Sequence, residues 1–315
     1  MAQRTQTIPL EGIPEYELGR QRGLWSDALR RLSRNRFALA ALGLLLVVAV
    51  VAILANYVST VQRYDPAMDQ DYSHLQEGPS WDHWFGTDAL GRDNWARVMQ
   101  GTWISLRVGI GVQMMVLFIG LLVGGAAALG GRWMDNAMMR FTDLTYAFPD
   151  LLAIILLRAA FAERDLPWVS HSTSQLFLVI FAIGFVAWVT VARLVRGQML
   201  ALKERDFVLA ARAMGAPAWR VVVVHMLPNT LGPVIVAVVF GIPLAIFAEA
   251  VLAFIGIGLP PPTASLGVLI SDGYRYIQVN IWVVTFPAAV IAILMLCFTF
   301  LGDGLRDALD PRSSR

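Results

Sequence analysis

The sequence predicts an all-α membrane protein, a polytopic bundle of about six transmembrane helices. Only 15% of the 315 residues are charged and 57% are hydrophobic, whereas about 25% of residues are charged in a soluble domain. Five stretches contain no Asp, Glu, Lys or Arg, and each can hold the roughly 20 apolar residues that cross a bilayer. These stretches lie at 37–62, 108–131, 166–192, 221–248 and 276–302.

Six spans are expected, at about 37–58, 106–131, 138–159, 175–195, 229–256 and 279–301. The third is interrupted by Asp143 and Asp150, and Pro149 between them can kink it. We include it because the loop charges alternate correctly only with six spans. The cytoplasmic segments then carry 18 Lys and Arg against seven outside, as the positive-inside rule predicts.

This arrangement places both termini in the cytoplasm, with 1–36 as the N-terminal segment and 303–315 as the tail. The segment 59–103 lies outside, and its several tryptophans suit a membrane interface or a surface docked on the spans. The net charge of +2 gives no case for a nucleic-acid partner. Membrane lipid is the expected surrounding of residues 37–302.

The most informative loop is the basic cytoplasmic segment 196–225. Ala210 and Ala211 favour a helix, and Gly215 can end that helix by adopting a positive φ. Pro217 after Ala216 is acceptable as the first residue of a second helix. The residues thus predict a short helix–turn–helix, which either approaches another protein or lies on anionic lipid.

Ala210, Ala211 and Gly215, followed by Leu227 and Pro228, resemble the cytoplasmic signature loop of ABC importer permeases. Further similarity is to the second (C-type) membrane subunit of the dipeptide, oligopeptide and nickel branch. It is carried by FGTDALGRD at 85–93, AEAVLAFIGIG at 248–258 and LGDGLRDALDPR at 301–312. This sequence departs from the family at Leu209, where a glutamate is usual. At His225 the family usually has a branched apolar residue, although this branch often has histidine there.

The resemblance implies the type I importer fold, with 37–302 as the permease domain and the loop as a coupling helix for an ATPase. It also implies a homologous permease partner, two cytoplasmic ATPase subunits, an extracytoplasmic solute-binding protein and a bacterial or archaeal inner membrane. ATP and Mg²⁺ would be bound by the ATPases, because the chain has one lysine, Lys203, outside any phosphate-binding motif. No cofactor, metal site or catalytic set is expected in this chain.

Ionisable groups at membrane depth are functional candidates. Asp143 and Asp150 are two helical turns apart and would share one face of the third span, lining a path for cargo. Alternatively, Asp143 lies at the interface and Asp150 pairs with an arginine or a backbone donor. Glu249 could touch cargo or gate the path, or pair with an arginine of the partner permease. Arg107 and Arg158 are expected to snorkel to the outer interface.

Two further features are the glycines of the second span, which predict close helix packing, and a turn outside the membrane. The residues at 86–93 predict this turn, followed by a helix that begins near Asp93. The turn either docks a partner protein or is purely structural. Its residues are Gly86, Thr87, Asp88, Gly91, Arg92 and Asp93. The competing function is a secondary transporter or channel working alone, for which the inverted repeats are not evident; a membrane-embedded enzyme ranks third.

Overall fold

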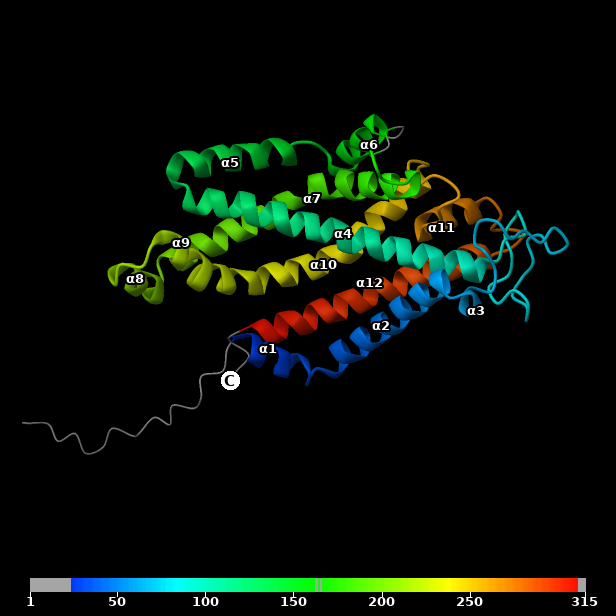
Figure 1. Cartoon of the computed structure of the whole chain (residues 1–315), viewed down its shortest axis with the longest axis horizontal. Coiled ribbons are helices and arrows are strands. Elements are labelled where there is room, and N and C mark those ends of the chain that lie inside the picture. Colours follow the sequence, from blue (N-terminus) through cyan, green and yellow to red (C-terminus); the bar gives the residue numbers. More distant parts are fainter. Residues whose placement is uncertain (1–23, 162–163, 165, 311–315) are drawn as a thin grey trace, which may run out of the picture.

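The computed structural model describes residues 24–161, 164 and 166–310, whose regular elements are all helices. Five long helices form an elongated bundle (Figure 1). They are α2 (Arg36–Tyr57), α4 (Asn94–Leu129), α7 (His171–Lys203), α10 (Leu227–Phe254) and α12 (Trp282–Leu309). The shorter ones are α1 (Leu24–Leu32), α3 (Ser59–Gln62), α5 (Gly131–Tyr146), α6 (Asp150–Ala160), α8 (Asp206–Ala213), α9 (Ala218–Arg220) and α11 (Leu266–Tyr274), with a π-helical turn η1 (Val221–Met226) before α10.

The five long helices are long and apolar enough to cross a membrane, and each coincides with a predicted span. Their outward faces carry large apolar side chains such as Phe37, Leu46 and Phe118, which are exposed in the isolated chain. Helices that are apolar on all sides require a lipid or protein environment. Three boundaries differ clearly from expectation, because α4 begins at Asn94, α7 continues to Lys203 and α12 runs through most of the predicted tail to Leu309.

The predicted third span, 138–159, is not one helix, and that expectation is corrected. Its residues divide between α5 and α6, which are 16 and 11 residues long. Pro149 disfavours helical geometry at Phe148 and itself has extended geometry, with ψ 122°, as the cap of α6. A proline that was expected to kink the helix therefore breaks it.

The two ends of the bundle are distinguished by the short helices they carry, α8 at one and α11 at the other (Figure 1). The chain passes from the α8 end to the α11 end through α5 and α6 together. Both α1 and the end of α12 lie at the α8 end, where Arg31 Nη1 donates to the carbonyl of Asp310 over 3.1 Å.

Close packing of α4 on α7 depends on glycine. A Cβ at Gly124 would lie 2.3 Å from the carbonyl oxygen of Ala192, and one at Gly120 would lie 2.6 Å from Cγ1 of Val191. Both distances are far below a van der Waals contact, so the two backbones approach as closely as they do only because side chains are absent. The predicted packing role is confirmed at these two glycines, whereas Gly125 has space around it.

Candidate functional site

The loop at the α8 end forms the predicted helix–turn–helix. Helix α8 ends at Gly215 with φ +81°. The N–H of Gly215 donates to Arg212 O and that of Ala216 to Ala211 O, over 2.9 and 3.0 Å. These two bonds are the Schellman arrangement that closes a helix. Pro217 caps α9 one residue earlier than expected.

This loop exposes apolar side chains at the tip of the molecule. Met214 and Trp219 are 82% and 68% exposed, and Phe207 and Leu209 are also exposed. Clustered apolar side chains on a polar surface mark a protein-interaction site. A Cβ at Gly215 would meet nothing within 4 Å, so this glycine is required for its backbone conformation rather than for packing within the chain.

Leu227 and Pro228 begin α10 directly after the π-helical turn η1. Pro228 has no N–H, and inside a regular α-helix its ring would crowd the carbonyl four residues earlier. The wider π-helical turn precedes it, and the N–H of Leu227 reaches back five residues to Val222 O. Leu227 and Pro228 therefore lie where the cytoplasmic loop predicted from the sequence meets the long helix α10.

A cavity of about 350 Å³ lies among α4, α6, α7 and α10. Most of its lining is apolar, and its polar groups are the Asp150 carboxylate, the Gln113 amide and the Thr190 hydroxyl. The Gln113 amide lies against Gly241, where an added Cβ would be 2.4 Å from Oε1. Of the three predicted intramembrane acids, only Asp150 lines this cavity.

Asp143 lies elsewhere, and the expectation that it shares a helical face with Asp150 is wrong because the helix breaks between them. Its Oδ1 accepts a hydrogen bond from Arg193 Nη2 at 2.8 Å, with both side chains substantially exposed.

Glu249 is 1% exposed and is not among the residues that line this cavity. Its carboxylate oxygens accept hydrogen bonds from Ser265 Oγ at 2.5 Å and Ser105 Oγ at 3.3 Å. Its hydrogen-bond partners among the described residues are therefore hydroxyls of its own chain. Glu249 joins α10 to α4 and to the start of α11.

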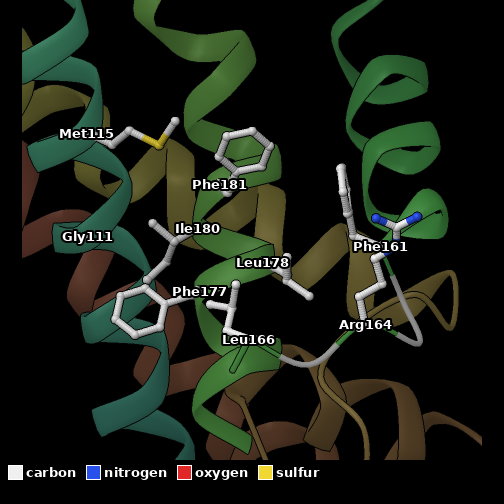
Figure 2. Close-up of a pocket in the computed structure, with 9 residues that line it drawn as sticks. All are labelled: Gly111, Met115, Phe161, Arg164, Leu166, Phe177, Leu178, Ile180 and Phe181. Atoms are coloured by element: carbon white, nitrogen blue, oxygen red, sulfur yellow. The ribbon is translucent and has the colours of Figure 1, made fainter. Parts of the chain in front are cut away.

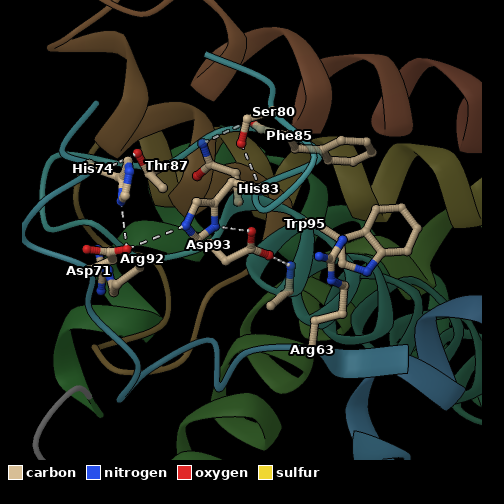
Figure 3. A network of polar contacts seen from close by, with 12 residues as sticks. Arg63, Asp71, His74, Ser80, His83, Phe85, Thr87, Arg92, Asp93 and Trp95 are labelled. Atoms are coloured by element: carbon tan, nitrogen blue, oxygen red, sulfur yellow. Dashed lines mark hydrogen bonds and ion pairs between the residues drawn. The ribbon is translucent and has the colours of Figure 1, made fainter. Parts of the chain in front are cut away.

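The six residues of the predicted outer turn are mostly buried. Asp93 caps α4 by accepting the Ala96 N–H at 2.8 Å, and its second oxygen lies 2.9 Å from His83 Nδ1 (Figure 3). The predicted start of a helix near Asp93 is confirmed. Asp88 accepts from Arg92 Nε at 2.8 Å and from Arg97 Nη1 at 2.5 Å.

The remaining turn residues also serve the local fold. Gly86 and Gly91 have φ of +73° and +71°, and a Cβ at either would lie 2.2 Å from a backbone oxygen. The Thr87 carbonyl accepts the Asn280 amide at 3.2 Å, which ties the turn to the segment before α12. These contacts support a structural turn at these positions.

Arg158, which was expected to snorkel to the outer interface, is a buried side chain. It does not snorkel to the interface, since its residue is only 4% exposed. Its Nη2 donates to the carbonyl of Gly258 at 3.3 Å, and among the described residues nothing accepts a hydrogen bond from its Nε or Nη1. The sequence shows that Arg158 follows Ile154 by four residues and so lies on the same face of a helix. It does not show that Arg158 is buried.

A larger cavity of about 760 Å³ lies between α4, α7 and the turn after α6 (Figure 2). Phe161, Phe177 and Phe181 line it together with aliphatic residues, and Arg164 is its charged lining residue. Such a lining suits an acyl chain or an apolar protein surface. The smaller cavity, where polar groups from separate helices converge, is the stronger candidate for a polar solute.

Comparison with known proteins agrees with this geometry. Residues 117–315 match the family model described as binding-protein-dependent transport system inner membrane component. Residues 23–79 match the N-terminal TM domain of oligopeptide transport permease C.

Curated relatives align along almost the whole chain. The oligopeptide transport system permease protein OppC of Bacillus subtilis is 38% identical over 92% of this chain and 90% of the relative. The dipeptide transport system permease protein DppC of the same organism is 39% identical over 92% and 86%. OppC of Escherichia coli K12 is 37% identical over 99% of each chain.

Among solved structures, a chain of the MetNI methionine ABC transporter in an inward-facing conformation aligns with a TM-score of 0.51. The alignment covers 68% of this chain and 96% of that one, at 21% identity. At that identity, the similarity concerns the fold. From the family match and the relatives, this chain belongs to the binding-protein-dependent transport system inner membrane component family and is a permease subunit of the ABC importer type.

Proposed function

We propose that the chain is the C-type membrane subunit of an importer for peptides or similar solutes. It forms the translocation path with a homologous permease, receives cargo from a solute-binding protein outside, and is driven by two cytoplasmic ATPase subunits. ATP and Mg²⁺ bind to those subunits. The named relatives, which are oligopeptide and dipeptide permeases at 37–39% identity, support the peptide assignment.

The observation that carries the proposal is the α8–Gly215–α9 loop, a rigidly closed turn that presents Met214 and Trp219 to the solvent. Its apolar tip suits insertion into a groove of the ATPase subunit, where burial of large apolar side chains stabilises association. Closure of the two ATPases would then move the loop and switch the bundle between discrete arrangements.

The orientation follows from charge. The α8 end carries the basic segment 193–220 and both described chain ends, so it faces the cytoplasm under the positive-inside rule. The α11 end, with the buried Asp93 turn, faces outward. In this orientation the cavity that contains Asp150 lies between the coupling loop and the outer surface.

The test compares Gly215→Val with Gly131→Val in the affinity-purified complex. Both glycines have positive φ, +81° and +79°, and open space around the missing Cβ, but only Gly215 lies in the loop. A left-handed conformation costs a residue with a side chain roughly 1–2 kcal/mol, so the loop conformation becomes about 5–30-fold less populated.

We expect Gly215→Val to lower solute-stimulated ATP hydrolysis and uptake together, while Gly131→Val retains both. Two ATPase subunits and a second permease should co-purify with the wild-type chain. A chain that purifies alone and transports without ATP would contradict the proposal.

A further inference from the structure

Arg158 is buried with most of its hydrogen-bonding capacity unused. A guanidinium carries five N–H donors and stays charged in proteins. Here Nη2 reaches the Gly258 carbonyl at 3.3 Å, whereas Nε and Nη1 find no acceptor among the described residues. A buried cation without an anion is strongly disfavoured. The Nε and Nη1 groups of Arg158 are therefore suited to bind an anionic partner.

The position of Arg158 relates it to the smaller cavity. Asp150, Ile154 and Arg158 follow one another at four-residue intervals on α6 and so share one face of that helix. The first two line the cavity, and Arg158 is the next residue on this face toward the α11 end. Its carbonyl partner, Gly258, lies just beyond the end of α10, which forms the opposite wall.

The two charges on this face of α6 are complementary to those of a zwitterionic peptide. The Asp150 carboxylate is a partner for an ammonium group, and the Arg158 guanidinium is a partner for a carboxylate, which it can bind through two parallel hydrogen bonds. The buried Gln113 amide lines the same cavity from α4 and offers both a donor and an acceptor to a peptide group.

The spacing also fits a short peptide. Eight residues of α-helix separate Asp150 from Arg158, a rise of about 12 Å. An extended peptide covers about 3.3–3.6 Å per residue, so three or four residues match this rise.

We propose that Arg158 is a specificity residue that binds the C-terminal carboxylate of the transported peptide. It does so at the α11 side of the cavity, while Asp150 faces the amino terminus. This assignment rests on the proposed peptide-importer function. In the described state Arg158 donates a hydrogen bond to the Gly258 carbonyl and lies outside the cavity lining. When the peptide binds, its carboxylate replaces this carbonyl as the partner of the guanidinium.

The experiment measures uptake of trialanine and of trialanine amide by the complete importer, with wild-type chain, Arg158→Gln, Arg158→Lys or Arg164→Gln. Arg164 is the matched control, because it is an exposed arginine that lines the larger cavity instead. The ratio of variant to wild-type rate is taken for each peptide separately, so the preference of the solute-binding protein cancels.

We expect Arg158→Gln to lower trialanine uptake by about 10- to 100-fold, the usual effect of losing hydrogen bonds to a charged group, and to change amide uptake less than twofold. Arg158→Lys should recover part of the trialanine uptake rate, because its Michaelis constant for trialanine should be lower than that of Arg158→Gln. Arg164→Gln should match wild type for both peptides.

Equal losses for the two peptides, or no loss for either, would overturn the assignment. Failure of the second permease to co-purify with Arg158→Gln would also overturn it and would place Arg158 at the subunit interface. The proposed function is judged separately, by ATP-dependent uptake and by co-purification of the ATPases in the wild-type complex.

Discussion

The packing of α4 on α7 can be tested at two adjacent glycines that differ only in their neighbours. In Gly124→Ala the new Cβ would lie 2.3 Å from the Ala192 carbonyl oxygen and 2.8 Å from Val195 Cβ. Ordinary contact begins at 3.4 Å, so the helices must separate by about 1.1 Å at this point. Gly125→Ala is the control, because its nearest neighbour is Met199 Sδ at 3.9 Å.

Overpacking of a well-packed interface costs roughly 1–3 kcal/mol, whereas replacing glycine by alanine in a helix gains up to about 1 kcal/mol. Gly124→Ala should therefore be destabilised by about 1–2 kcal/mol, and Gly125→Ala should be neutral or slightly stabilised. We would measure the unfolding midpoint of the purified complex in detergent by tryptophan fluorescence. The buried Trp188 is a suitable probe because it packs between the same two helices, α4 and α7. Equal midpoints for both variants would refute the close-approach argument.

Three further outcomes are expected. Asp150→Asn should lower ATP-dependent uptake of peptides with a free amino terminus, whereas Asp143→Asn should leave uptake unchanged, because its exposed ion pair contributes little. The hydrogen bond to Asp71 raises the pKa of His74, so its stabilisation is complete below the unfolded pKa of about 6.5 and is lost as pH rises through the folded value. His74→Gln should therefore weaken the fall of the unfolding midpoint as the pH rises above about 6.5. Asp93→Ala removes the α4 cap and the carboxylate partner of His83 Nδ1, which should cost roughly 1–3 kcal/mol in the same melts.

Sequence reasoning was most successful where local chemistry decides the structure. Long charge-free stretches predicted the five long helices, because a bilayer excludes unpaired charge whatever the tertiary packing. Gly215 was predicted to take a positive φ because few other residues tolerate it. The cap at Asp93 followed from the preference for aspartate at that position.

It failed where the outcome depends on neighbours distant in sequence. Pro149 was visible, but whether a proline bends or breaks a helix depends on whether other helices support the two halves. The burial of Arg158 depends on the turn at Gly258, a hundred residues away. Helix α11 was missed although Ser265 caps it, a signal present in the sequence before a short apolar run.

Helix α4 has a length that its role in a bilayer does not require. Its 36 residues extend about 54 Å, against roughly 30 Å of hydrocarbon. One end is fixed in the outer turn by Asp93, and at the other end the Ala128 carbonyl accepts a hydrogen bond from Lys203, three residues before α8. Helix α4 thus connects the α11 end of the bundle to the segment before α8, so a tilt of this stiff helix at the α11 end would displace the α8–α9 loop at the other end.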